Sequence, residues 1–104
     1  MRSHNLEVFR NRDIDMIIMG VPSDHKHLRL IIKSGNKYLV FQEATIAAIV
    51  RAYVNVKTHP LRRAIKMVRC NLIYRKEGYA DQQLLEVDID EEAIINELDR
   101  VLES

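Results

Sequence analysis

The stretch that decides the fold runs from residue 27 to residue 41 and reads HLRLIIKSGNKYLVF. Apolar and basic residues alternate through its first half, as in a strand with one face turned inward. Gly35 and Asn36 separate this half from a second apolar run at residues 38–41. Both residues tolerate the positive φ that a two-residue turn requires, so the stretch predicts a β-hairpin.

Two further strands are expected before this hairpin. Residues 6–10 have the composition of a short strand, and residues 16–19 form an apolar run that is closed by Gly20. Turn-forming residues lie between these runs. The first forty residues therefore predict antiparallel β-hairpins.

The pattern changes after residue 41. Residues 42–57 contain no glycine or proline and are apolar around most of the circumference of a helix. A helix that is apolar on nearly all sides is usually enclosed by the rest of the protein. We therefore expect a buried central helix here.

The stretch from residue 60 to residue 70 predicts a second helix. Thr58 is suited to cap it, and Pro60 to occupy its first turn. Apolar residues recur at the spacing of one helical face, and basic residues occupy the other face. The apolar face holds Leu61, Ala64, Ile65, Val68 and Leu72, and the basic face holds Arg62, Lys66 and Arg69. This pattern indicates a basic amphipathic helix.

The last third of the chain predicts a strand pair and a final helix. Strands are expected at residues 71–74 and 84–89, with a turn at residues 75–78 between them. Asp88 or Asp90 is expected to cap an acidic C-terminal helix. The apolar stripe of this helix consists of Ile94, Ile95, Leu98, Val101 and Leu102. The predicted order is ββββ-α-α-ββ-α, which is an α+β fold in a single domain over residues 1–104 with no linker.

Composition sets the class of protein. Apolar residues make up 47% of the chain and charged residues 30%, which is typical of a soluble globular protein. The single cysteine cannot form an intrachain disulfide and fits a reducing compartment. No apolar stretch is long enough for a signal peptide or a membrane span. We expect a small cytoplasmic protein with no membrane partner.

Charge is sorted along the chain, although the net charge is only +1. Residues 57–76 contain seven basic residues and no acidic one, which we call the basic segment. Residues 81–104 contain nine acidic residues and one basic residue, which we call the acidic segment. Sorting of this kind predicts a docking surface for a polyanion, or two segments that lie against each other.

The predicted element order from residue 44 to residue 87 is that of a winged helix, in which the second helix reads the major groove. On this analogy the basic segment binds nucleic acid or an acidic protein, with a steep dependence on salt. The binding residues are then Arg62, Arg63, Lys66, Arg69, Arg75 and Lys76. Two alternatives stand beside it. The acidic segment pairs with the basic segment inside the fold, or it meets the basic segment of another subunit.

Other functions have weaker signals. The apolar stripe of the C-terminal helix predicts either core packing or the interface of a homodimer or scaffold subunit. No catalytic, phosphate-binding or metal-binding motif is present, and two neighbouring histidines, His25 and His27, are too few for a zinc site. We therefore expect no cofactor, no metal and no catalytic residues. An enzyme whose site assembles from scattered residues such as Cys70, His59 and Asp24 remains a third alternative.

Overall fold

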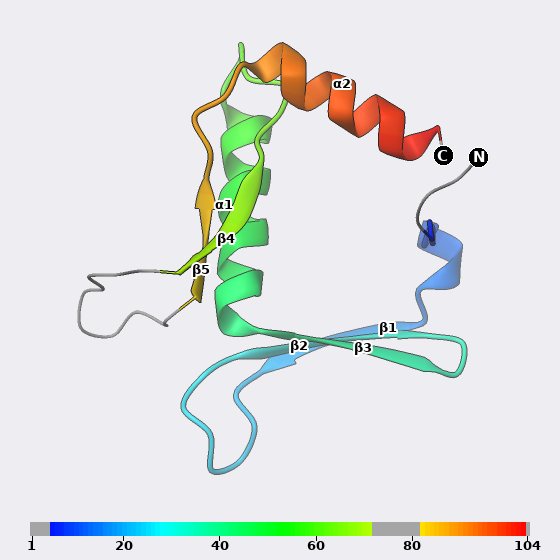
Figure 1. The fold of residues 1–104 in the computed structure, drawn as a ribbon. Coiled ribbons are helices and arrows are strands. Elements are labelled where there is room, and N and C mark those ends of the chain that lie inside the picture. Colours follow the sequence, from blue (N-terminus) through cyan, green and yellow to red (C-terminus); the bar gives the residue numbers. More distant parts are fainter. Residues whose placement is uncertain (1–4, 72–81, 104) are drawn as a thin grey trace. The chain divides into compact units, whose positions relative to one another are not determined.

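The computed structural model describes residues 5–71 and 82–103 (Figure 1). Contacts along the chain separate two compact units. One unit comprises residues 7–46, and the other comprises Asn5, Leu6 and the described residues from Ala47 onward. The single-domain organisation expected from the sequence stays a prediction. The α+β class is confirmed, because each unit contains an antiparallel sheet and two helices follow the first sheet in the chain.

The first unit contains a three-stranded antiparallel sheet in the order β1-β2-β3. Its strands are β1 (Met16–Gly20), β2 (Arg29–Ser34) and β3 (Lys37–Gln42). Ser34 pairs with Lys37, so the turn between β2 and β3 holds two residues, as the sequence predicts. Gly35 has a φ of +62°, the positive value that glycine supplies at the first central position of a type II′ turn.

The strand expected at residues 6–10 is wrong. This segment has no strand pairing and leads into a short 3-10 turn, η1 (Asn11–Asp13). The backbone N–H of Arg10 donates to Oδ2 of Asp13 at 2.9 Å, and the N–H of Asp13 donates to the carbonyl of Arg10 at 2.9 Å. These reciprocal bonds satisfy the backbone locally, which takes the place of a β-ladder.

The helix expected at residues 42–57 is confirmed as α1 (Glu43–Thr58), but it is only partly buried. Ile46 and Ala48 are buried, whereas larger apolar side chains on another face are half exposed or more. These exposed residues are Ile49, Val50, Tyr53 and Val54. The composition predicts burial on all sides, but within the described residues the helix encloses mainly its small side chains.

The basic amphipathic helix expected at residues 60–70 is also wrong. Residues 62–66 are irregular and lead into β4 (Met67–Asn71), which pairs with β5 (Gln82–Glu86). The N–H of Val87 donates to the carbonyl of Lys66 at 3.0 Å and extends the pairing. Partner-dependent β-pairing outweighs the helical periodicity of a short segment, because isolated helices of this length are marginal. The winged-helix element order is therefore absent from the described residues.

Thr58 illustrates the same correction. It is the last residue of α1, and its hydroxyl donates to the carbonyl of Val54 at 2.6 Å, so it caps no second helix. The strand expected at residues 84–89 lies at Gln82–Glu86 instead. The strand expected at residues 71–74 and the turn at residues 75–78 fall, beyond Asn71, outside the described residues.

The C-terminal helix is confirmed as α2 (Glu91–Leu102). Asp90 is its N-cap, and its carboxylate accepts the backbone N–H of Glu92 at 3.4 Å. Glu91 and Glu92 lie in the first turn, where negative charge complements the helix dipole. Neither helix of the described residues is long and apolar enough to cross a membrane.

Candidate functional site

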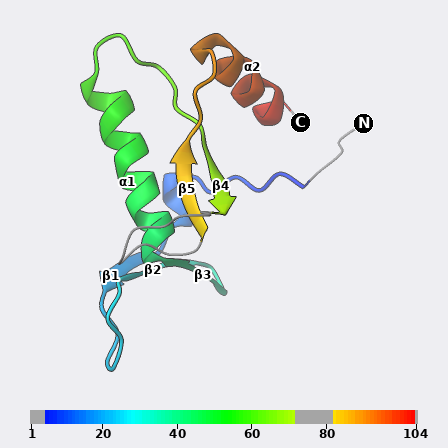
Figure 2. The ribbon, with the colours of Figure 1, turned by 60° about the vertical axis from the view of Figure 1, so that its left-hand side comes forward.

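The second unit joins the segment after α1 to the start of α2. After α1 the chain passes through residues 59–66 into the β4–β5 hairpin, and a short connection then leads from β5 into α2 (Figure 2). Met67 pairs with Glu86, and the bond from Val87 to Lys66 continues this alignment. The basic residues before β4 are therefore aligned with the acidic residues that follow β5. We call this region the ion-pair cluster, and it is formed by Arg62, Arg63, Lys66, Glu86, Glu91, Glu92 and Glu97.

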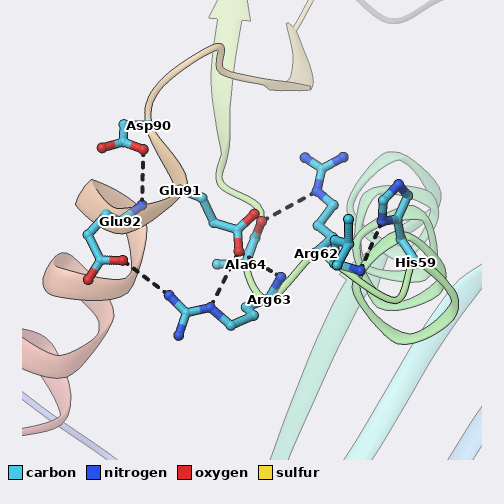
Figure 3. A network of polar contacts seen from close by, with 8 residues as sticks. His59, Arg62, Arg63, Ala64, Asp90, Glu91 and Glu92 are labelled. Carbon is cyan, nitrogen blue, oxygen red and sulfur yellow. Dashed lines mark hydrogen bonds and ion pairs between the residues drawn. The ribbon is translucent and has the colours of Figure 1, made fainter.

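Arg63 lies at the centre of the cluster (Figure 3). Its backbone N–H donates to Oε1 of Glu91 at 2.8 Å, and its Nε lies 3.6 Å from the same carboxylate. Its Nη2 donates to Oε2 of Glu92 at 3.1 Å. One arginine thus joins the irregular segment to both acidic residues of the first turn of α2. Its side chain is nevertheless 62% exposed, so water screens these contacts.

Two more ion pairs complete the cluster. Arg62 pairs with Glu86 and also donates through Nε to the carbonyl of Ala64 at 3.4 Å. Nζ of Lys66 lies 2.6 Å from Oε2 of Glu97. This hydrogen bond lowers the pKa of Glu97 below its usual 4.5, with a further contribution from the lysine charge, while desolvation acts in the opposite direction.

The geometry answers the question raised by the sorted charges. Arg62, Arg63 and Lys66 are paired with carboxylates of the acidic segment within one chain. A phosphate approaching any of the three competes with a carboxylate already in place. Arg69 lies in β4 and is exposed, whereas Arg75 and Lys76 fall outside the described residues. The six predicted binding residues are therefore not presented as one uncovered basic face.

The apolar stripe of α2 has the opposite character. None of its residues is buried, although it is the most regular apolar pattern in the chain. Leu98 is 49% exposed and Leu102 is 61% exposed, while the other three members are half-buried. The ion-pair cluster holds the helix mainly by acidic residues of its first turn and by Glu97, so the stripe itself contributes little burial.

Two exposed surfaces were not expected from the sequence. The first is the apolar face of α1 described above. The second is β1, where every side chain from Met16 to Met19 is exposed. The signal that could have found β1 is its composition, because an apolar run without alternation belongs to a strand covered on both faces.

The enzyme alternative gains no constellation within the described residues. Nδ1 of His59 accepts a hydrogen bond from the N–H of Leu61 at 3.3 Å, and Asp24 belongs to the other unit. An open cleft of about 450 Å³ in the first unit borders the ion pair between Glu7 and Lys37. Among the described residues, no group of three or more histidine, cysteine or acidic residues is arranged to hold a metal.

Comparisons with protein-family models, with curated proteins and with solved structures find no match to this chain. The functional argument therefore depends on the geometry of the chain itself.

Proposed function

We propose that this protein is a homo-oligomeric or scaffold subunit, and that the apolar stripe of α2 forms the contact with a second copy. The supporting observation is that a regular amphipathic helix has no buried residue while its charged side chains are paired to its own chain. Unpartnered apolar stripes of this kind are typical of protein interfaces.

The stripe suits self-association because its charged flanks are neutralised. Arg63 pairs with Glu92 on one flank, and Lys66 pairs with Glu97 on the other. Two copies of an acidic helix repel each other when their flanks carry unbalanced charge. Here the pairing within each chain removes much of that repulsion.

A two-fold axis at Leu98 gives the simplest arrangement. Antiparallel packing then places Ile94 and Ile95 of one helix beside Leu102 and Val101 of the partner subunit, with the two copies of Leu98 in contact. The helix has 12 residues and is therefore about 18 Å long. A pair of such helices buries less than the roughly 800 Å² per partner of a standard interface, so we expect a dissociation constant in the range of about 1 μM to 1 mM.

Leu98→Glu tests this function directly. The substitution places a charge at the two-fold axis beside its own symmetry mate, so we expect the variant to be monomeric at concentrations where the wild type associates. Asn96→Glu is the matched control, because it adds the same charge to an exposed position of the same helix outside the stripe. Sedimentation velocity gives the mass of each. A monomeric wild type up to about 1 mM, or equal effects of the two variants, contradicts the proposal.

Nucleic-acid binding is the second proposal, and the exposure of Arg69 is the observation that favours it. Arg69→Glu is the sharper test, because substituting Arg62 or Lys66 also breaks an ion pair of the fold. We expect wild-type protein to shift a duplex or single strand at about 50 mM salt and the variant to bind more weakly. Absence of any shift by the wild type removes this proposal. The single cysteine supports a reducing, cytoplasmic setting for either function.

A further inference from the structure

β1 forms one edge of the three-stranded sheet, since it pairs with β2 and with no other strand of the described residues. Its four non-glycine side chains are between 37% and 62% exposed. The strand contains no charged residue and no proline. Edge strands in proteins usually carry such residues, because an apolar edge with unpaired backbone groups readily accepts another strand.

The other sheet edges differ from β1. β3 begins with Lys37 and ends with Gln42, so polar residues stand at both of its ends. In the second unit, Nη2 of Arg51 donates to the carbonyl of Leu84 at 3.0 Å, so a helix side chain occupies an acceptor of β5. β1 is therefore the least protected of these three strands.

We propose that β1 is a strand-addition site for β1 of a second copy, in antiparallel orientation about a two-fold axis at Ile18. In this register Ile17 lies opposite Met19 of the partner subunit, and Met16 lies opposite Gly20 of the partner subunit. Directly opposed residues share one face of a sheet, so the apolar residues of both faces continue across the junction. The pairing joins two three-stranded sheets into one sheet of six strands.

Charge at the two ends of β1 favours a second copy in this orientation. Asp13 and Asp15 precede the strand, whereas the loop that follows it leads to His25 and Lys26. Antiparallel pairing brings the acidic end of each strand beside the end that leads to the basic residues of the other. Parallel pairing brings acidic ends together, which is unfavourable.

This interface is separate from the α2 interface, because β1 and α2 belong to different units. Each contact uses the same surface on both partners. A chain with two such contacts links into assemblies larger than a dimer, either closed or open. The strand interface therefore adds a scaffold property that the α2 contact alone lacks.

Ile17→Lys tests the strand interface, because Ile17 is 62% exposed and lies in the proposed junction twice. We expect it to weaken this contact at least about tenfold, since lysine is a residue that protects sheet edges. Val40→Lys is the matched control. Val40 lies in β3 of the same sheet and is 59% exposed, so the same charge is added away from β1.

The measurement uses the Leu98→Glu background, in which only the strand contact remains. We expect sedimentation velocity to show a dimer for Leu98→Glu alone and with Val40→Lys, and a monomer with Ile17→Lys. Amide exchange of residues 16–20 should slow as concentration rises. A monomeric Leu98→Glu with concentration-independent exchange overturns the strand interface and leaves the α2 proposal standing. Association lost through Ile17→Lys but unaffected by Leu98→Glu has the reverse meaning.

Discussion

Replacing Gly35 by alanine tests the turn that sets the register of β2 and β3. A non-glycine residue in the left-handed region costs about 1–2 kcal/mol. A Cβ at this position meets no atom within 4 Å, so no steric clash adds to that cost. We therefore expect Gly35→Ala to lower the free energy of unfolding by about 1–2 kcal/mol, all of it from the backbone conformation at φ +62°.

Gly20→Ala is the matched control in the same sheet. A Cβ there also meets no atom within 4 Å, but the φ of Gly20 lies outside the left-handed range. Alanine should be neutral there or stabilise by up to about 1 kcal/mol, because it restricts the unfolded chain. Gly35→Asn should lose less than Gly35→Ala, since asparagine tolerates positive φ better than most residues.

Chemical and thermal unfolding followed by circular dichroism measure these differences. At about 4–8 °C per kcal/mol, Gly35→Ala should lower Tm by at least about 4 °C. Amide exchange at residues 30–41 then shows whether the loss is local to the hairpin. Equal stability of the Gly35→Ala and Gly20→Ala proteins refutes the assignment of the cost to the positive φ.

Two further predictions concern single carboxylates. The pKa of Glu43 is lowered, chiefly because its carboxylate accepts the N–H of Leu28 and then because His27 and Arg29 lie nearby. Its contribution to stability should therefore be complete above about pH 4.5 and be lost as pH falls through the lower folded pKa; denaturation from pH 3 to 7 should show this slope in wild type and less of it in Glu43→Gln. Asp90→Ala should destabilise α2 by about 1 kcal/mol through loss of its N-cap, whereas Asp90→Asn should retain most of the stability; amide exchange of α2 checks this, and equal losses exclude the capping role.

The elements that the sequence predicts correctly are those governed by local chemistry. The turn at Gly35 and the cap at Asp90 each depend on one residue type at one position. The basic segment fails because its structure depends on residues that are distant in sequence. Its helical periodicity is real, but Met67–Asn71 gains a strand partner in Gln82–Glu86, and no local pattern reveals that partner.

The candidate site shows the same division. Sorting of charge correctly indicates that the basic and acidic segments are related, yet it leaves open whether they pair within one chain. That choice is made by the register of β4 and β5, which aligns Lys66 with Val87 and so brings Arg63 to the start of α2. The exposure of β1 is likewise invisible in the sequence, because composition predicts a covered strand and only the strand order shows an edge.

The two-residue turn at Gly35 also has a consequence for the order of folding. Ser34 and Lys37 pair across the shortest loop in the fold, and hairpins with such loops close in about 1–10 μs. β4 and β5 instead meet only after the chain between Asn71 and Gln82 has closed on itself, which costs more entropy. We therefore expect β2 and β3 to pair first, with β1 joining a template that already exists.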